Sequence, residues 1–218
     1  MRALIIFIYG GLLWLNLLMG CSRTEQSKLL KLEQSAKSIQ AIIQIDNVRR
    51  NTCRKVLQII ARHNPEMPAG LKKEIANEIY TMSQKYPNLD VDLICATITH
   101  ESARTWDPKV VSKAGALGLM QVMPGTGEWL AKYEAISWTS AEDILCNPIY
   151  NIRIGARYLS ALIETYDLEG GLAAYNGGVK RAEMWLTNNK ADGILWAETN
   201  EYIPSILKIY DEYKSSAL

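Results

Sequence analysis

The feature that most constrains the fold is the spacing of the apolar residues, which recur every three or four positions along most of the chain. That spacing places them on one face of an α-helix, whereas a half-buried strand requires strict alternation of apolar and polar residues. No alternating stretch of useful length is present, and Gly, Pro and Asn separate one helical pattern from the next. The sequence therefore predicts an all-α protein.

Capping and breaking signals place the individual helices of the region after Gly70. Asp and Asn favour the position before a helix, Pro favours its first turn, and a Thr followed by Glu three residues later forms a capping box. These signals predict five helices: about 71–86; a helix capped by Asp90 and ending near Ser102; one opened by Thr139 and Glu142; one opened by Asn147 and Pro148 and ending near Gly170; and about 199–214, where Pro204 can bend the helix.

The first 20 residues have the pattern of a secretory signal. Arg2 precedes an apolar run over 3–18, which is shorter than the roughly 20 residues that a membrane-spanning helix needs. The run ends in Leu-Met-Gly before Cys21, which resembles a lipobox, where the signal is removed and the cysteine receives a lipid. We expect a lipoprotein signal peptide over 1–20 and lipidation of Cys21. An ordinary cleaved signal, or an uncleaved anchor with an incidental cysteine, remains open.

The segment after the signal is polar and has apolar residues at helical spacing up to about Ile59. It is interpreted as a spacer over 21–65, with a helix packed on the domain as the alternative. The tract 64–70 contains two prolines and a glycine, which interrupt a helix. The boundary of the main domain, 66–218, is therefore placed in this tract.

Composition excludes several classes of partner. The net charge is +1 with acidic and basic residues interleaved, so the chain lacks the basic stripe of a nucleic-acid-binding protein. The two histidines, His63 and His100, do not fit a zinc-ligand spacing, and we expect neither a metal nor a cofactor. With Cys21 acylated, at most one disulfide can form among the other cysteines, which are interpreted as small buried residues: Cys53, Cys95 and Cys146.

Glu101 is the candidate catalytic acid. It continues, at helical spacing, the apolar face formed by Val91, Ile94, Cys95 and Ile98. A carboxylate at the end of an apolar face, and at the C-terminus of a helix, is disfavoured by desolvation and by the helix dipole. Both effects raise the pKa toward neutrality, as a general acid requires. The alternative is a frayed helix end that turns into solvent.

The stretch 112–121 is rich in Gly and Ala and ends in Gln121. Small residues allow the backbone to approach another segment or a ligand closely, and the Gln side chain can bond both hydroxyls and N-acetyl amides. A glycine-rich turn between two helices explains the same composition.

Four motifs occur in order: Glu101-Ser102; Gly118-Leu119-Met120-Gln121; Ala174-Tyr175-Asn176; and Glu198-Thr199 with Tyr202. This order resembles the family 1 lytic transglycosylases, the bacterial relatives of goose-type lysozyme, over about 71–213. The resemblance implies a lysozyme-like helical domain with a long glycan cleft.

The resemblance also implies roles for matched positions. Glu101 would act first as acid and then as base, with its carboxyl held by the Tyr202 hydroxyl. The matched positions expected to bind substrate are Ser102, Ser112, Gly118, Met120, Gln121, Tyr175 and Asn176. Two departures from the family pattern stand out. Arg104-Thr105 is extra, which makes the match of Ser112 less secure, and Gly177-Gly178-Val179 replaces the more common Ala-Gly-Pro.

The function that the resemblance implies is cleavage of the β-1,4 bond between N-acetylmuramic acid and N-acetylglucosamine, leaving a 1,6-anhydro end. The expected partners are peptidoglycan strands and, through the lipid, a membrane of the cell envelope. In a diderm host this would be the outer membrane, facing the periplasm. A goose-lysozyme-like hydrolase and an inactive cell-wall-binding lipoprotein are the alternatives.

Overall fold

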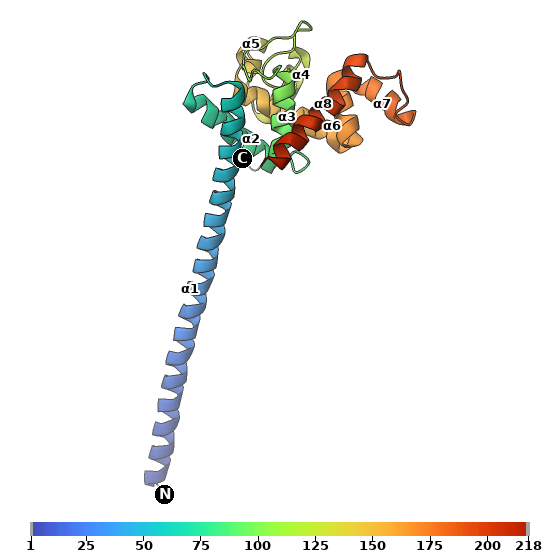
Figure 1. The fold of residues 1–218 in the computed structure, drawn as a ribbon. Coiled ribbons are helices and arrows are strands. Elements are labelled where there is room, and N and C mark those ends of the chain that lie inside the picture. The colour runs from blue at the N-terminus through green and yellow to red at the C-terminus, as the bar shows by residue number, and fades with distance from the viewer. Residues whose placement is uncertain (1, 217–218) are drawn as a thin grey trace. The chain divides into compact units, whose positions relative to one another are not determined.

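The computed structural model describes the backbone of residues 2–216 and the side chains of residues 25, 26 and 28–216. Outside its turns, the described chain is helical apart from isolated bridges within 111–122 (Figure 1). The expected all-α class is confirmed. The helices in chain order are α1 (Arg2–His63), α2 (Ala69–Lys85), α3 (Val91–Glu101), α4 (Pro124–Ala131), the 3-10 helix η1 (Lys132–Glu134), α5 (Ala141–Leu145), α6 (Pro148–Gly177), α7 (Val179–Thr187) and α8 (Ala197–Ser215).

The chain divides into two units, residues 1–50 and 51–218. In the first unit, the described side chains are almost all exposed, including apolar ones such as Leu32, Ile42 and Ile45. The predicted signal sequence and Cys21 lie outside the side chains that the structure describes. Within the described residues, no helix has a stretch long and apolar enough to cross a membrane.

The second unit begins before the boundary predicted at 65/66. Val56, Ile59 and Ile60, near the end of α1, are completely buried in its core. The apolar spacing that suggested a spacer therefore continues, over 51–63, into a helix that packs on the domain, which was the alternative interpretation. The Pro-containing tract 64–70 is only the turn from α1 into α2.

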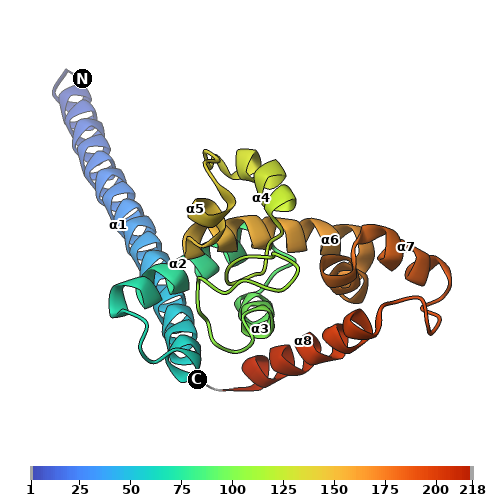
Figure 2. The ribbon, with the colours of Figure 1, turned by 90° about the horizontal axis from the view of Figure 1, so that it is seen from above.

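The core of the second unit is centred on α3. Every residue from Leu93 to Thr99 is buried, because α2 and α8 both pack against this helix (Figure 2). Asp90 caps the helix as predicted, since its carboxylate accepts a 2.8 Å hydrogen bond from the Leu93 amide. Because these buried residues fix the position of α3, they also fix the position of its last residue, Glu101.

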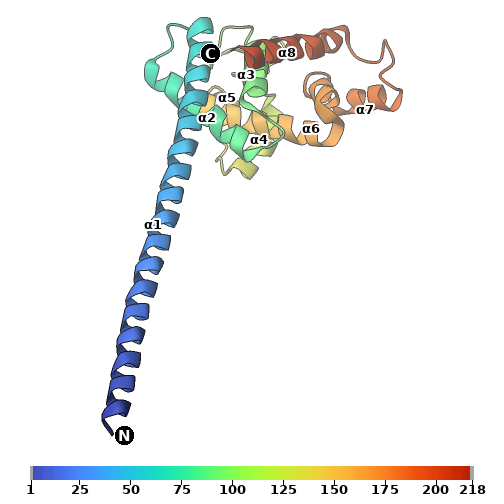
Figure 3. The same ribbon diagram turned by 60° about the horizontal axis from the view of Figure 1, so that its bottom comes forward.

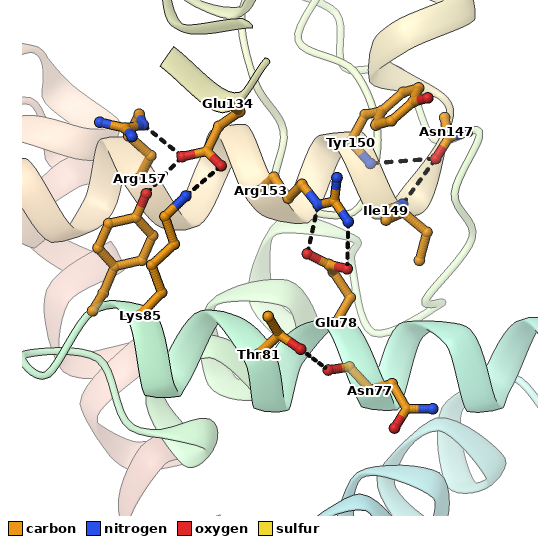
Figure 4. Close-up of polar contacts among 11 residues, drawn as sticks. Asn77, Glu78, Thr81, Lys85, Glu134, Asn147, Ile149, Tyr150, Arg153 and Arg157 are labelled. Carbon is orange, nitrogen blue, oxygen red and sulfur yellow. Dashed lines mark hydrogen bonds and ion pairs between the residues drawn. The ribbon is translucent and has the colours of Figure 1, made fainter. Parts of the chain in front are cut away.

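Helix α6 begins as expected but extends beyond its predicted end. The Asn147 side chain accepts hydrogen bonds from the amides of Ile149 and Tyr150 (Figure 4). Near the predicted end at Gly170, Asp167 leaves helical geometry with φ 59°. A Cβ on Gly171 would lie 2.8 Å from the Ile163 backbone, so glycine allows the two segments to pack closely. The second segment runs on to Gly177, where α7 packs beside α6 (Figure 3).

The capping box predicted at Thr139 is displaced by one residue. Ser140, in extended geometry, is the N-cap of α5, and its hydroxyl accepts a 3.1 Å bond from the Asp143 amide. Thr139 instead donates to the Asp143 carboxylate at 3.3 Å. Both residues can cap a helix, and the backbone geometry at Ser140 decides between them.

Two ion-pair clusters fasten α2 to the helices around it (Figure 4). Arg153 of α6 binds Glu78 through two bonds of 2.7 and 3.1 Å. Glu134 of η1 accepts bonds from Lys85, Tyr86 and Arg157. These pairs connect α2, η1 and α6 on a face that does not include Glu101.

Candidate active site

Glu101 is the last residue of α3 and its side chain is half-buried. The Tyr202 hydroxyl, from α8, donates a 2.6 Å hydrogen bond to Glu101 Oε1. This is the contact that the family resemblance implied, between residues that are far apart in sequence. It exists because α3 and α8 pack side by side. The alternative of a frayed helix end does not describe this residue.

The pKa of Glu101 is raised to about 7. Burial is the main cause, because it disfavours the charged form. The hydrogen bond from Tyr202 opposes the rise, and repulsion from Glu198 adds to it. A carboxyl with this pKa is partly protonated near neutral pH and can both give and take a proton.

Tyr202, the hydrogen-bond partner of Glu101, is almost completely buried. Only 2% of the residue is exposed, and its ring makes an edge contact with His100 at a centroid distance of 4.8 Å. Burial and the nearby Glu101 carboxylate raise its pKa well above the ordinary value, as they do for Tyr175. Both hydroxyls therefore stay protonated, and Tyr202 remains a hydrogen-bond donor.

The Gly-rich segment is a tight loop organised by Asn151 of α6. The buried Asn151 amide donates to the carbonyls of Leu117 and Leu145, and its oxygen accepts from the Met120 amide at 2.7 Å. A Cβ on Gly118 would lie 2.2 Å from the Leu145 carbonyl oxygen, so only glycine fits there. Close backbone approach, one of the two interpretations of this segment, is what the structure shows.

Gln121 and Asn176, two of the predicted substrate-binding residues, each have one side-chain group that is available to bind a ligand. Gln121 Nε2 donates to the carbonyls of Val110 and Gly118, so its oxygen is the remaining acceptor. Asn176 accepts a 2.7 Å bond from the Thr199 hydroxyl, so its NH₂ group is the remaining donor. An acceptor and a donor together match the N–H and C=O of an N-acetyl group.

Tyr175 lies beside Glu101, but its hydroxyl already donates to the Met120 carbonyl at 2.7 Å. The aromatic ring is therefore the part of Tyr175 that can contact a sugar. It packs against the Tyr158 ring at a centroid distance of 5.4 Å. Tyr158 in turn lines an apolar groove of about 500 Å³ between α4, α6 and α7, together with Trp129 and Tyr133.

Other predicted binding residues hold the backbone in place. Ser102 and Met120 are fully buried. The Ser102 hydroxyl donates to Ile98 and accepts from the Trp106 amide. Ser112, which is half-buried, accepts a 3.0 Å bond from the Ala116 amide. The structure thus brings Glu101, Tyr202 and Tyr175 together. Ser102, Met120 and Gly118 are buried.

Three positioning residues were not assigned roles from the sequence: His100, Asn151 and Thr199. Asn151 is a polar residue on the apolar face of α6, and that placement could have identified it as a buried anchor. His100 carries no local signal, and Thr199 belongs to the fourth motif but was given no role there. Their contacts with Tyr202 and Asn176 depend on the packing of α8. Among the described side chains, no group of three His, Cys, Asp or Glu could hold a metal ion, and no disulfide joins Cys53, Cys95 and Cys146.

Comparison with known proteins finds the same family that the motifs suggested. The transglycosylase SLT domain family matches residues 78–195. The soluble lytic murein transglycosylase of Escherichia coli is 31% identical over 214 residues, covering 92% of this chain and 30% of that protein. The membrane-bound lytic murein transglycosylase C of Shigella sonnei is 34% identical, covering 50% of this chain and 32% of the relative.

Solved structures agree with these matches. An inactive glutamate-to-glutamine mutant of lytic transglycosylase Slt from Pseudomonas aeruginosa superposes with a TM-score of 0.54 at 28% identity. The similarity covers 62% of this chain and 23% of that one. The chain therefore spans about a third or less of the length of these relatives.

Proposed function

Since this chain belongs to the transglycosylase SLT domain family, we propose that it is a peptidoglycan lytic transglycosylase with Glu101 as its catalytic acid and base. The observation that carries the proposal is the Glu101–Tyr202 pair, in which a half-buried carboxyl has a pKa of about 7 and a tyrosine donor. The names of the relatives, lytic murein transglycosylases, support the same reaction.

The proposed reaction needs one protein carboxyl. Protonated Glu101 gives its proton to the glycosidic oxygen as the bond to C1 of N-acetylmuramic acid breaks, and the N-acetyl oxygen of that sugar stabilises the cation. Ionised Glu101 then takes the proton of the C6 hydroxyl, whose oxygen forms the new bond to C1. The acid is regenerated, and the product ends in a 1,6-anhydro ring. An internal nucleophile of high effective concentration can outcompete water.

The glycan would lie across Gln121, Asn176 and the ring of Tyr175. Its next sugars would reach the groove of Trp129, Tyr133 and Tyr158, where flat apolar rings with polar edges suit sugar faces. Trp129 and Tyr133 are 56% and 51% exposed, so they are open to a ligand.

Mass spectrometry of the products released from purified sacculi tests the activity. Anhydro-ended muropeptides are expected. Reducing ends would identify a goose-lysozyme-like hydrolase instead, and binding to sacculi without any release would identify an inactive cell-wall-binding protein.

For location, we propose the cell envelope, with a lipid on Cys21 and residues 21–50 as a helical spacer. The lipobox-like sequence and the membrane-bound relative support this placement. In a diderm host, Ser22 after the lipidated cysteine favours the outer membrane. Replacing Cys21 with Ala should abolish fatty-acid labelling and release the protein into the soluble fraction, and unchanged labelling would contradict the proposal.

The extent of the spacer can be tested by shortening the chain. A chain that begins at Asn51 should fold and retain activity on isolated sacculi, because it keeps Val56, Ile59 and Ile60. A chain that begins at Asn64 loses these completely buried side chains. Each such loss costs about 2–5 kcal/mol, so the melting temperature should fall sharply. Equal melting temperatures would restore the boundary predicted at 65/66.

A further inference from the structure

A second pocket lies between the C-terminal end of α3 and the middle of α8. Its volume is about 440 Å³. The residues that line it are His100, Ala103, Arg104, Ser205, Lys208 and Ile209. None of these side chains is an acid, whereas two are permanent cations at neutral pH. The reaction proposed above does not use this pocket.

The two cations of the pocket are not neutralised by the protein. Neither Arg104 nor Lys208 has an ion-pair partner among the side chains that the structure describes. Glu212, an acid of the same helix, is paired with Arg62 at 3.4 Å. The charge of Arg104 acts on His100, because after burial it is the main cause of the lowered pKa of His100, and the charge of Glu198 opposes it. The pocket therefore presents two cations without an ion-pair partner among the described side chains, together with other hydrogen-bond donors.

The backbone around Arg104 is held in an unusual shape. Ala103, Arg104 and Trp106 all have positive φ, at 50°, 63° and 50°. Left-handed geometry costs free energy for residues other than glycine, and such residues concentrate at functional sites. The turn persists because the Arg104 amide bonds to Thr99 and the buried Trp106 ring is anchored on the same helix.

The pocket adjoins the catalytic carboxyl. Tyr202 connects the two sites, because its hydroxyl bonds to Glu101 while its ring contacts His100, which lines the pocket. The pocket and the Glu101 carboxyl therefore lie at the same end of α3.

We propose that this pocket binds a carboxylate of the peptide carried by N-acetylmuramic acid in the glycan strand. The proposal rests on the proposed function, because it assumes that peptidoglycan is the substrate. In a strand that carries its peptides, the lactyl carboxyl of N-acetylmuramic acid is part of the amide bond to the peptide. The sugars then offer only neutral hydroxyls and amides, whereas the attached peptide carries free carboxylates. A guanidinium can bind a carboxylate through two parallel bonds, and the Lys208 ammonium and Ser205 hydroxyl supply further donors. The pocket would thus favour strands with free peptide carboxylates over strands whose peptide carboxylates are amidated.

Binding can be measured without turnover in the full chain carrying Glu101→Gln. Calorimetric titration compares an N-acetylmuramyl peptide that has free carboxylates with the same peptide after amidation. We expect roughly ten-fold tighter binding of the free form, the size of a charged hydrogen bond. Adding Arg104→Gln and Lys208→Gln should remove this difference. Adding Lys73→Gln, an exposed lysine of α2, should leave it unchanged. Equal affinity for the two peptides would overturn the proposal.

Turnover provides the second test, with the Glu101 side chain intact. Lys208→Gln alone is the safer variant, because Lys208 is exposed on α8 and lies outside the strained turn. On peptide-bearing strands the variant should raise KM several-fold and leave kcat unchanged, and on strands whose peptide carboxylates are amidated it should match the unchanged protein. A protein that binds the free-carboxylate peptide but cuts neither strand would contradict only the proposed function. A protein whose KM depends on neither the peptide nor Lys208 would overturn only this pocket.

Discussion

Burial disfavours the charged form of two glutamates of the second unit, Glu101 and Glu134, but the neighbours of each carboxyl have opposite effects on its pKa. Glu101 ends α3 with a neutral donor, Tyr202, and its pKa rises to about 7. Glu134 in η1 is also enclosed, with only 3% of its side chain exposed. Burial alone would raise the pKa of Glu134, but bonds from Lys85, Tyr86 and Arg157 outweigh burial and lower it (Figure 4).

The comparison shows that burial makes a carboxyl a candidate acid only when no cation neutralises it. Glu134 stays ionised and connects three elements of the fold. Its hydrogen bonds and ion pairs therefore stabilise the folded state. Glu101 has no ion-pair partner among the described residues, and its proton can therefore be transferred. The two residues predict opposite consequences for the same Glu→Gln change.

The largest effect is expected for Glu101→Gln. The amide keeps the shape of the side chain but has no transferable proton, so release of muropeptides from sacculi should fall about 10²–10⁴-fold. Stability should not fall with it. The folded pKa of Glu101 lies above its unfolded value, so its ionisation costs stability as pH rises through about 7. The variant should melt no lower than the unchanged protein at pH 8. Near-normal release would move the assignment to Glu198, the acid of the fourth motif.

The second-largest effect is expected in the pH dependence of activity, which should follow the ionisation of Glu101 and not that of Glu134. Because Glu101 must begin the reaction protonated, kcat/KM should decline as pH rises through about 7. Each further pH unit lowers the protonated fraction about ten-fold. Initial rates on sacculi, measured at a series of pH values on both sides of 7 and at constant ionic strength, give this alkaline decline. A rate that stays level well into the alkaline range would show that another group supplies the proton.

Glu134→Gln should cost stability and leave chemistry intact. Its partners Lys85 and Arg157 are partly exposed, so solvent reduces the loss to about 1–3 kcal/mol of unfolding free energy at pH 7. The folded pKa of Glu134 lies below its unfolded value, so this contribution is present above the unfolded pKa and disappears as pH falls through the folded one.

Urea unfolding at neutral and at acid pH measures the difference between the Glu134 variant and the unchanged protein. The gap should narrow in acid, while the activity of the folded protein stays unchanged. Glu169→Gln, which breaks an exposed pair with Lys190, is the matched control and should change little. An equal loss of unfolding free energy in both variants would mean that the ion pairs of the enclosed Glu134 stabilise the fold no more than an exposed pair does.

The smallest effect is expected for Tyr202→Phe. Its hydroxyl lowers the pKa of Glu101 against the effect of burial, so removing it should raise that pKa and shift the alkaline limb upward, by up to about one unit. Turnover should persist. Tyr213→Phe is the control, because that buried hydroxyl bonds to Thr99 and His63 instead of Glu101. A shift of equal size in both variants would remove the specific role of Tyr202.

Prediction from the sequence succeeded where the cause is local. The helix class, the caps at Asp90 and Asn147 and the family membership follow from neighbouring residues and ordered motifs. The cap at Thr139 was wrong by one residue, because Ser140 can make the same bond and the backbone chooses between them. The boundary at 65/66 differs from the structure because an amphipathic face does not reveal whether a core lies against it.

The sequence by itself determined that this chain is helical, that α3 presents an apolar face ending in Glu101, and that its motifs belong to one family. These properties depend on contacts between residues three or four apart, or on residue order alone. Only the tertiary structure decided which carboxyl keeps a proton near neutral pH. That outcome depends on what packs against each acid: Tyr202 from a distant helix at Glu101, and three donors, two of them cations, at Glu134. The same long-range packing leaves Arg104 and Lys208 without an ion-pair partner among the described side chains.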